Sequence, residues 1–304
     1  MMEFLYLLEK IRVPVLNEIL LAITALGEET AFLMIGLIVF WCVGKRQGYY
    51  LMTVGLSGTV FSQLMKIVCR VPRPWVQDSN FTILEAAREA ASGYSFPSGH
   101  TQTAVGTFGS IAAFTRRKWI VAACVTLAVL VAFSRMYIGV HTPADVLVGA
   151  LLSVVLIAVF YPLMLGKKDR TYAGLILLTV FSVAYLLYME TATFPADIDL
   201  HNYESAMKNA YTLIGCSTAL LIVYPVEKRY IDYSEKAIWW GQILKVALGL
   251  LAVLAVKEGL RSPLELLFNG HLAARAVRYF LIVIVAGIVW PLTFRFFGKM
   301  GNTK

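Results

Sequence analysis

The chain has 304 residues, of which 59% are hydrophobic and only 15% are charged. Its mean hydropathy of +0.70 excludes a soluble globular domain, and several segments reach the roughly 20 apolar residues needed to cross a bilayer. The net charge of +8 comes from short basic clusters between apolar runs. That arrangement orients membrane spans and argues against a nucleic-acid partner. Four scattered cysteines without a CxxC pair predict neither a disulfide framework nor a zinc site.

The first 29 residues predict an amphipathic segment lying at the membrane interface. Charged residues such as Glu9, Lys10 and Arg12 interrupt its apolar pattern, which argues against a cleavable signal peptide. We expect residues 30–166 to form the catalytic membrane core. Residues 167–304 are expected to add further transmembrane helices, for which the sequence indicates no role.

The rest of the chain predicts an all-α, polytopic helical bundle of about nine spans. The expected spans are 30–44, 48–68, 100–115, 119–138, 143–165, 171–189, 208–225, 237–256 and 275–297. Basic clusters fall in alternate connections, so these connections can all be cytoplasmic. The remaining connections, including 69–99 and 139–142, then lie on the extracytoplasmic side of a membrane that we expect to be a bacterial-type plasma membrane.

Polar residues of unusual chemistry gather at these outer helix ends. They are Lys66 and Arg73-Pro74, then Pro97-Ser98-Gly99-His100, then Ser134-Arg135 followed by His141 and Asp145. Charges at a membrane boundary are costly unless solvated or paired, so the cluster is a candidate functional site. Guanidinium groups, an ammonium group and a helix N-terminus are typical of phosphate binding.

Each residue alone also has a structural interpretation. Lys66 and Arg135 could be interfacial anchors, and Ser98 could simply cap a helix. Thr142-Pro143-Ala144-Asp145 has the pattern of a helix start with Thr142 at the N-cap, so Asp145 could be only part of a cap. These interpretations do not explain why the residues gather at one bilayer face.

The set Lys66-x6-Arg73-Pro74, Pro97-Ser98-Gly99-His100 and Ser134-Arg135-x5-His141-x3-Asp145 resembles the three-part signature of the type-2 phosphatidic acid phosphatase superfamily. That superfamily also includes bacterial acid phosphatases, glucose-6-phosphatases, sphingosine-phosphate phosphatases and vanadium haloperoxidases. The resemblance covers about residues 50–165.

The resemblance implies a metal-independent phosphatase without a cofactor, which works through a phosphohistidine intermediate. His141 would be the nucleophile, Asp145 would orient it, and His100 would protonate the leaving oxygen and then activate water. The implied phosphate-binding residues are Lys66, Arg73, Ser98, Gly99 and Arg135.

A lipid phosphomonoester is the favoured substrate, because a site at headgroup depth can accept a phosphate whose chain stays in the bilayer. Membrane lipids would be its partners. The alternatives are a polyprenyl diphosphate such as undecaprenyl diphosphate, for which Arg70 or Arg88 could hold a second phosphate, and a sugar phosphate as in the glucose-6-phosphatases. A transporter or scaffold on the same fold is the non-enzyme alternative, and the intact histidine pair argues against it.

Two further polar stretches are weaker signals. The segment FPADIDLHNYE contains Asp197, Asp199, His201 and Glu204, and a solvated connector is favoured over a metal site. Arg275 and Arg278 lie three residues apart on one face of the last span. Interfacial anchoring is the favoured interpretation for these two arginines, and contact with phosphate or lipid headgroups is the alternative.

Overall fold

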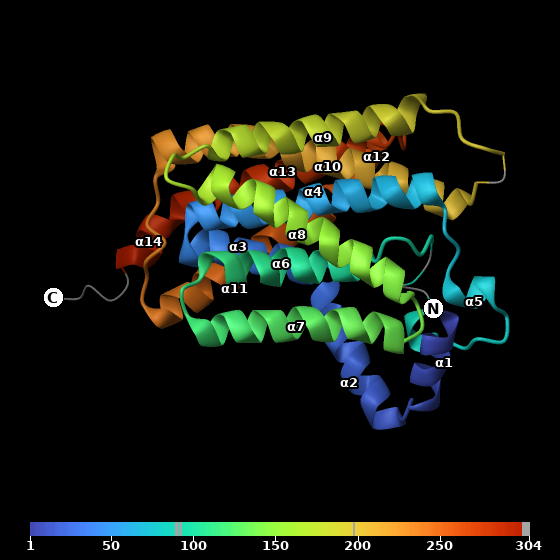
Figure 1. Cartoon of the computed structure of the whole chain (residues 1–304). Helices are drawn as coiled ribbons and strands as arrows, with labels where there is room; N and C mark the ends of the chain where they lie inside the picture. The colour runs from blue at the N-terminus through green and yellow to red at the C-terminus, as the bar shows by residue number, and fades with distance from the viewer. Residues whose placement is uncertain (89–90, 92, 197, 300–304) are drawn as a thin grey trace. The chain divides into compact units, whose positions relative to one another are not determined.

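The computed structural model describes residues 1–88, 91, 93–196 and 198–299, and within them it is helical with no β-strand (Figure 1). The predicted all-α class is therefore confirmed. Two residues of interest to the sequence analysis lie outside the described residues. They are Asp197 of the acidic connector and Lys304 of the C-terminal basic cluster that helped to orient the expected spans.

Within the described residues, the first part of the chain forms eight α-helices separated by short 3-10 and π turns. They are α1 Met2–Lys10, α2 Pro14–Thr24, a 3-10 turn Ala25–Gly27, α3 Glu29–Ile38, a π turn Val39–Val43, α4 Lys45–Cys69, α5 Pro74–Gln77, a 3-10 turn Glu85–Ala87, α6 Gly99–Phe114, α7 Lys118–Tyr137 and α8 Pro143–Leu165.

Within the described residues, the second part forms six more α-helices and three short helical turns. They are α9 Thr171–Thr191, α10 Leu200–Val226, a π turn Glu227–Ile231, α11 Trp239–Gly259, α12 Arg261–Leu267, α13 Ala273–Ile284, a π turn Val285–Val289, a 3-10 turn Pro291–Thr293 and α14 Phe294–Lys299. Each of the nine predicted spans therefore coincides largely with helix.

Fewer helices than nine are both long and apolar enough to cross a membrane. Within the described residues six qualify, and the bent pair Pro14–Gly27 and Glu29–Val43, which meets at 57°, would make a seventh. Helix α6 has 16 residues, short of the roughly 20 that a full crossing needs. The polytopic helical fold is established, and the count of nine spans is unconfirmed.

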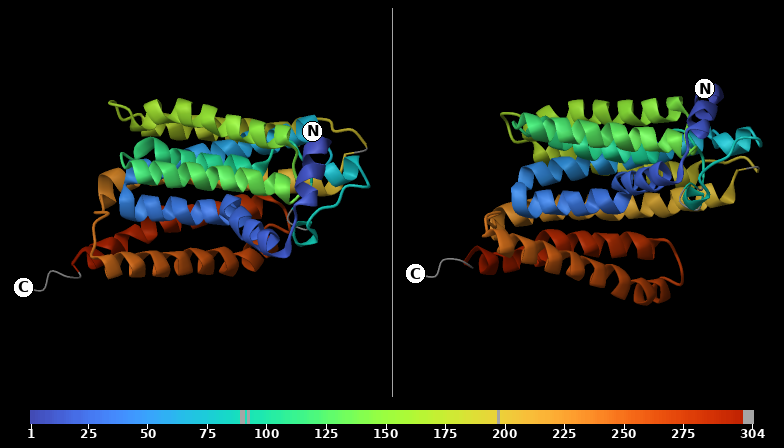
Figure 2. Two further views of the ribbon diagram at one scale, coloured as in Figure 1. Left: turned by 60° about the horizontal axis from the view of Figure 1, so that its bottom comes forward. Right: turned by 90° about the horizontal axis from the view of Figure 1, so that it is seen from below.

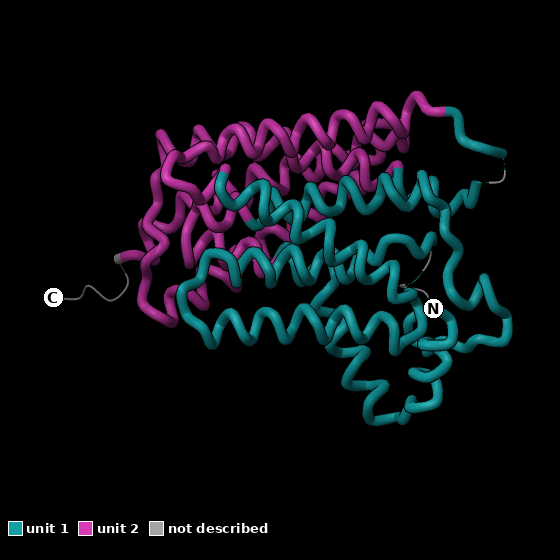
Figure 3. Tube along the Cα trace, in the orientation of Figure 1, with its two compact units in different colours: residues 1–33, 51–162, 193–206 teal, residues 34–50, 163–192, 207–304 magenta. Residues whose placement is uncertain are grey.

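The helices divide into two compact units (Figure 3). Unit 1 contains residues 1–33, 51–162 and 193–206, and unit 2 contains residues 34–50, 163–192 and 207–304. The predicted boundary between a catalytic core, residues 30–166, and further helices, residues 167–304, concerns function, and it stays a prediction.

Helices α6 and α7 lie side by side in unit 1, and α8 runs obliquely across α6 (Figures 1 and 2). A Cβ atom on Gly149 would come within 2.6 Å of the Ser98 carbonyl oxygen, so glycine allows α8 to approach the start of α6. The Ser98 backbone N–H donates to the Asp145 carbonyl at 3.0 Å, and Ser153 Oγ donates to the Gln102 carbonyl at 2.6 Å. These contacts fix the first turns of α6 and α8 against each other.

The N-terminal helices are packed into unit 1. Leu5, Leu8 and Leu20 are buried, and α2 packs against α7. Thr24, at the end of α2, accepts a hydrogen bond from Arg135 Nη1 at 2.6 Å. Residues 1–29 thus support a helix that carries a candidate site residue, while their predicted interfacial position stays a prediction.

Unit 2 is held together by buried polar contacts as well as apolar packing. The buried Lys245 ammonium of α11 donates to the carbonyl oxygens of Trp41 at 2.9 Å and Glu235 at 3.1 Å. Trp41 Nε1 in turn donates to the Ala286 carbonyl at 2.9 Å. These bonds satisfy groups whose burial would otherwise be costly.

Candidate active site

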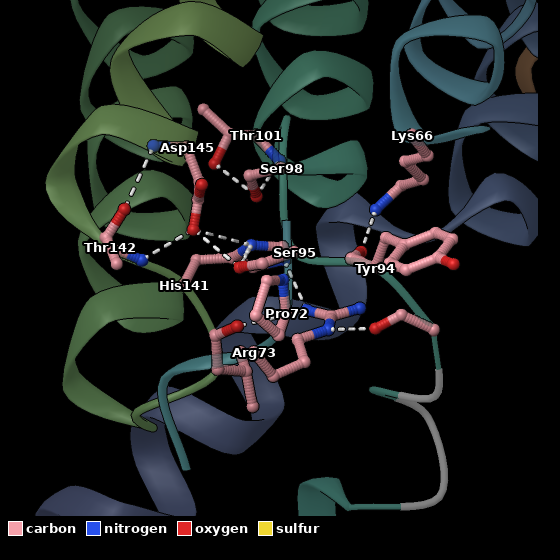
Figure 4. Close-up of polar contacts among 12 residues, drawn as sticks. Lys66, Pro72, Arg73, Tyr94, Ser95, Ser98, Thr101, His141, Thr142 and Asp145 are labelled. Carbon is pink, nitrogen blue, oxygen red and sulfur yellow. Dashed lines mark hydrogen bonds and ion pairs between the residues drawn. The ribbon is translucent and has the colours of Figure 1, made fainter. Parts of the chain in front are cut away.

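Unit 1 brings the three sequence motifs to one place (Figure 4). The last turn of α4 provides Lys66, and Arg73 lies at the N-cap of α5. The loop before α6 and the first turn of α6 provide the second motif. Arg135 belongs to the last turn of α7, and His141 and Asp145 come from the α7–α8 connection and the start of α8.

His141 lies between an arginine and a carboxylate. Arg73 Nη1 is 2.9 Å from His141 Nε2, and the imidazole is only 2% exposed. A guanidinium can only donate, so Nε2 must carry the lone pair and Nδ1 the proton. Nδ1 lies 3.6 Å from Asp145 Oδ2 and 3.4 Å from Ser95 Oγ. The surroundings thus select one tautomer of His141.

Asp145 is held rigidly by the helix start that the sequence predicts. The Thr142 backbone N–H donates to Asp145 Oδ2 at 2.7 Å, and the Asp145 N–H donates to Thr142 Oγ1 at 3.3 Å. This reciprocal pair is a capping box, so the predicted cap is confirmed. The same Oδ2 atom faces His141 and accepts from Ser95 Oγ at 2.6 Å. The capping and orienting interpretations are therefore compatible in one side chain.

The charge state of His141 follows from its surroundings. Burial lowers the pKa of His141 well below its ordinary value, and the positive charges of Arg73 and Arg135 lower it further. The imidazole is therefore neutral at neutral pH. A neutral imidazole with its lone pair on Nε2 is the form that can act as a nucleophile.

Three cations surround the histidines, each tied to the protein by part of its hydrogen-bonding capacity. Lys66 Nζ donates to the Tyr94 carbonyl at 2.7 Å. Arg73 donates to the carbonyl oxygens of Gly93 at 2.8 Å and Val140 at 3.0 Å. Arg135 is buried, and within the described part of the chain its Nε atom has no hydrogen-bond partner. Guanidinium and ammonium groups have several donors each, so an anion could still be bound here.

The second motif starts α6 as predicted. Ser98 is the N-cap, and its Oγ accepts from the Thr101 N–H at 3.4 Å and from Thr101 Oγ1 at 3.0 Å. Its own hydroxyl hydrogen is not used in either contact, so Ser98 can cap the helix and still donate to a ligand. Among the residues that the structure describes, a Cβ atom on Gly99 would meet no atom within 4 Å, so their packing does not demand glycine there.

His100 is half-buried in the first turn of α6 and adjoins Gly27. Arg135, Arg73 and Lys66 all lie close enough for their charges to act on its imidazole. His100 and His141 also act on each other electrostatically. The structure therefore brings together all eight residues that the sequence singles out for this site.

Sequence reasoning missed two supporting side chains. Ser95 is fully buried and contacts both Asp145 and His141, although its only signal is that it precedes the Pro97-Ser98-Gly99-His100 motif. Thr24 holds Arg135 from more than one hundred residues away in the chain, and no local pattern points to it.

The residues considered for a second phosphate lie at the edge of this region. Arg88 forms two hydrogen bonds with Glu85, at 2.6 and 2.7 Å, and its guanidinium is 5.7 Å from the Trp75 ring centroid. Arg73 also lies over the Trp75 ring, at 5.9 Å. Arg70 is exposed at the end of α4.

The acidic connector supports the active-site loop. Asn202 Oδ1, in the first turn of α10, accepts from the Tyr94 N–H at 2.8 Å, and the Asp199 N–H donates to the Tyr94 hydroxyl at 3.4 Å. Gly93 has a φ of +95°, and a Cβ atom there would clash with Asn202. The connector thus fixes the loop whose carbonyls hold Lys66 and Arg73.

A buried histidine thus faces a carboxylate and lies close to three cations, in a chain whose described residues include six candidate membrane spans. Residues 30–169 match the PAP2 superfamily model, and residues 211–302 match the model of the PAP2 superfamily phosphatase transmembrane extension. The chain belongs to the PAP2 superfamily and is a phosphatase.

Several known proteins are similar to part of the chain. The chain is 32% identical over 151 residues to undecaprenyl-diphosphatase BcrC of Bacillus subtilis, covering 48% of this chain and 75% of that protein. It is 31% identical over 156 residues to phosphatidylglycerophosphatase B of the same species, covering 48% and 74%. Mouse sphingosine-1-phosphate phosphatase 2 is 26% identical over 144 residues, covering 45% and 40%. No solved structure matches the chain.

Proposed function

We propose that the protein hydrolyses a phosphomonoester of a membrane lipid, with His141 as the nucleophile. The observation that carries this proposal is the arrangement of His141 between Arg73 at Nε2 and Asp145 at Nδ1. It supplies a neutral attacking nitrogen, a guanidinium beside the incoming phosphate and a carboxylate facing the opposite nitrogen.

In the first step Nε2 of His141 attacks phosphorus, an N–P bond forms, and the bond to the leaving oxygen breaks. His100 must be protonated at this stage, which the negative charge of the bound phosphate favours by offsetting the cations beside the imidazole, and it gives its proton to that oxygen. The imidazole of His141 becomes positively charged, and Asp145 stabilises it at Nδ1. Because Arg73 occupies the lone pair of Nε2 in the free enzyme, it must turn to the phosphate oxygens before attack occurs.

In the second step water attacks phosphorus and the N–P bond breaks. The now neutral His100 takes the proton from that water, which restores both histidines. Lys66, Arg73 and Arg135 would stabilise the equatorial oxygens in both steps, together with the Ser98 hydroxyl and the backbone at Gly99. The lack of a packing requirement for glycine at position 99 supports a close approach of phosphate to this backbone.

A lipid substrate is supported by the candidate membrane spans and by the relatives, which are named as phosphatases of undecaprenyl diphosphate, phosphatidylglycerophosphate and sphingosine 1-phosphate. A sugar phosphate has no such support. The transporter alternative is set aside, since the chain is a member of a phosphatase family.

A polyprenyl diphosphate is the second candidate substrate. The observation in its favour is that Trp75 lies against both Arg73 and Arg88, so a second guanidinium lies near the site. Arg88→Gln should then raise KM for undecaprenyl diphosphate about tenfold and leave phosphatidate hydrolysis unchanged. Equal effects on both substrates, or none on either, would favour the monoester.

Phosphate release in detergent tests the proposal. The purified protein should release inorganic phosphate from short-chain phosphatidate, with chelator present, and vanadate should inhibit it as a mimic of the transition state. His141→Ala should be inactive. Activity that disappears with chelator and returns with magnesium would contradict the metal-independent mechanism.

We also propose that the active site opens to the extracytoplasmic side of a plasma membrane. The basic clusters in alternate connections support this orientation. Single cysteines at Asp78 and Lys168, in a cysteine-free background, should react with impermeant maleimide from opposite sides of the membrane, Asp78 from outside. Reaction of both from one side would contradict the proposed topology.

A further inference from the structure

Unit 2 contains a cavity of about 600 Å³ at the ends of helices α10, α11 and α13, beside α12. Its walls are rich in positive charge. The basic residues that line it are Lys208, Lys257, Arg261, His271, Arg275 and Arg278. None of them belongs to the candidate active site.

Arg278 is the most informative of these residues. Its side chain lines the cavity and is 8% exposed, and within the described part of the chain its Nε atom has no hydrogen-bond partner. A buried guanidinium with an unused donor is costly unless a ligand completes its hydrogen bonds. The feature therefore points to a bound anion.

Arg275 lies three residues earlier on the same face of α13 and lines the same cavity. Its Nε atom donates to Thr212 Oγ1 at 2.7 Å, which orients the guanidinium. The guanidinium carbons of Arg275 and Arg278 lie 5.3 and 5.5 Å from the centroid of the Tyr279 ring. Tyr279 thus helps to hold two arginines at one cavity.

The acidic residues of the cavity wall already have cationic neighbours. Glu265 pairs with Arg261 at 3.4 Å, and Glu258 pairs with Lys257 at 3.7 Å. Within the described cavity wall, neither carboxylate is paired with Arg275 or Arg278. The wall therefore keeps a net positive charge around these two arginines.

From these contacts we infer that the cavity binds a phosphate group carried by an anionic membrane lipid. Two guanidinium forks match the oxygens of a phosphate in geometry and in charge. A free phosphate ion has the same chemistry, so the surroundings must decide between the two sources.

The surroundings favour a lipid. Leu266 and Leu267 of α12, the helix that also places Arg261 and Glu265 in the wall, are 78% and 73% exposed. Exposed leucines on a short helix next to charged residues are typical of a segment at the membrane interface. Helix α13 begins a candidate membrane span, Ala273–Gly298. A headgroup in the cavity would thus leave its acyl chains beside apolar helix surface.

Binding of short-chain phosphatidylglycerol to the full-length protein in a zwitterionic detergent tests the inference. This lipid is a phosphodiester, so turnover of a phosphomonoester does not complicate the measurement. Arg278→Gln and Arg275→Gln should each weaken binding about tenfold, since each removes a charge-assisted hydrogen-bond donor. Arg295→Gln, an exposed arginine of α14 outside the cavity wall, is the matched control and should bind as wild type.

Inorganic phosphate and short-chain diacylglycerol complete the design. If binding of inorganic phosphate depended on Arg278 and binding of phosphatidylglycerol did not, the cavity would be a site for the free ion. That result would overturn the inference of a lipid ligand. Diacylglycerol lacks phosphate, so neither substitution should change its binding. If Arg278→Gln lowers the melting temperature, Arg278→Lys and the half-buried Arg275→Gln provide the decisive comparison. Wild-type affinity for both phosphate probes in folded Arg275→Gln and Arg278→Gln would overturn the inference.

This test is separate from the proposed hydrolysis. Binding that depends on Arg278 should persist in the His141→Ala protein. If phosphate release failed but this binding held, only the catalytic proposal would be contradicted. If phosphate release succeeded but no binding depended on Arg278, only the inference of a second site would be contradicted.

Discussion

Arg73 donates from Nη1 to Nε2 of His141 across 2.9 Å, with both side chains buried. This contact selects the imidazole tautomer in the free enzyme and covers the nitrogen that we propose as the nucleophile. An arriving phosphate would draw Arg73 toward its oxygens and expose the lone pair. Substrate binding and release of the nucleophile would then be one event.

Replacing Arg73 tests this coupling. Arg73→Lys keeps the positive charge and loses the forked geometry, so kcat/KM for phosphatidate should fall on the order of 100-fold. Arg70→Lys, an exposed change at the end of α4, should have little effect. Steady-state kinetics of the two variants make the comparison, and equal losses in both would show that the effect is not specific to the contact between Arg73 and His141.

Asp145→Asn separates the cap from the chemistry. Asparagine caps helices about as well as aspartate in general, so the melting temperature should change little. Turnover should nevertheless fall on the order of 10³-fold, because an amide cannot stabilise the imidazolium at Nδ1. Near-normal turnover would leave Asp145 with only its capping bonds to Thr142.

Local patterns predicted the parts of the site that depend on local structure. The spacing from Thr142 to Asp145 was enough to predict the cap, and the apolar run after it predicted α8 with its observed bounds, Pro143–Leu165. Ser95 and Thr24 could not be found in this way, because their contacts join segments distant in sequence. The last span, 275–297, was predicted as one helix, whereas in the structure α13 is followed by a π turn and a 3-10 turn.

Ser95 should act by positioning Asp145 and His141. Ser95→Ala removes the donor that lies 2.6 Å from Asp145 Oδ2, and kcat should fall about tenfold with little change in KM. Ser79→Ala, in the exposed loop after α5, is the matched control. A purely structural role would instead lower the melting temperature and leave kcat of the folded fraction unchanged, which thermal unfolding and active-site titration with vanadate can distinguish.

The depressed pKa of His141 predicts how stability depends on pH. The unfolded imidazole takes up its proton below a pH of about 6.5, whereas the buried, neutral imidazole resists protonation to lower pH. The unfolded state therefore binds more protons below this pH, and His141 costs stability there, by at most about 1.4 kcal/mol per pH unit. His141→Gln should make the drop in melting temperature between pH 7 and pH 5 smaller. An unchanged or larger drop would contradict a neutral His141 in the folded protein.

Trapping of a phosphoenzyme tests the nucleophilic role of His141 most directly. In His100→Ala an aryl phosphate, whose leaving group needs no proton, should still phosphorylate His141, and hydrolysis should then stall without its general base. After a quench in base, radiolabel that is stable to alkali and labile to acid should be found on His100→Ala and absent from His141→Ala. Label that persists on His141→Ala, or that is lost in alkali as expected for an acyl phosphate, would contradict the assignment of His141 as the nucleophile.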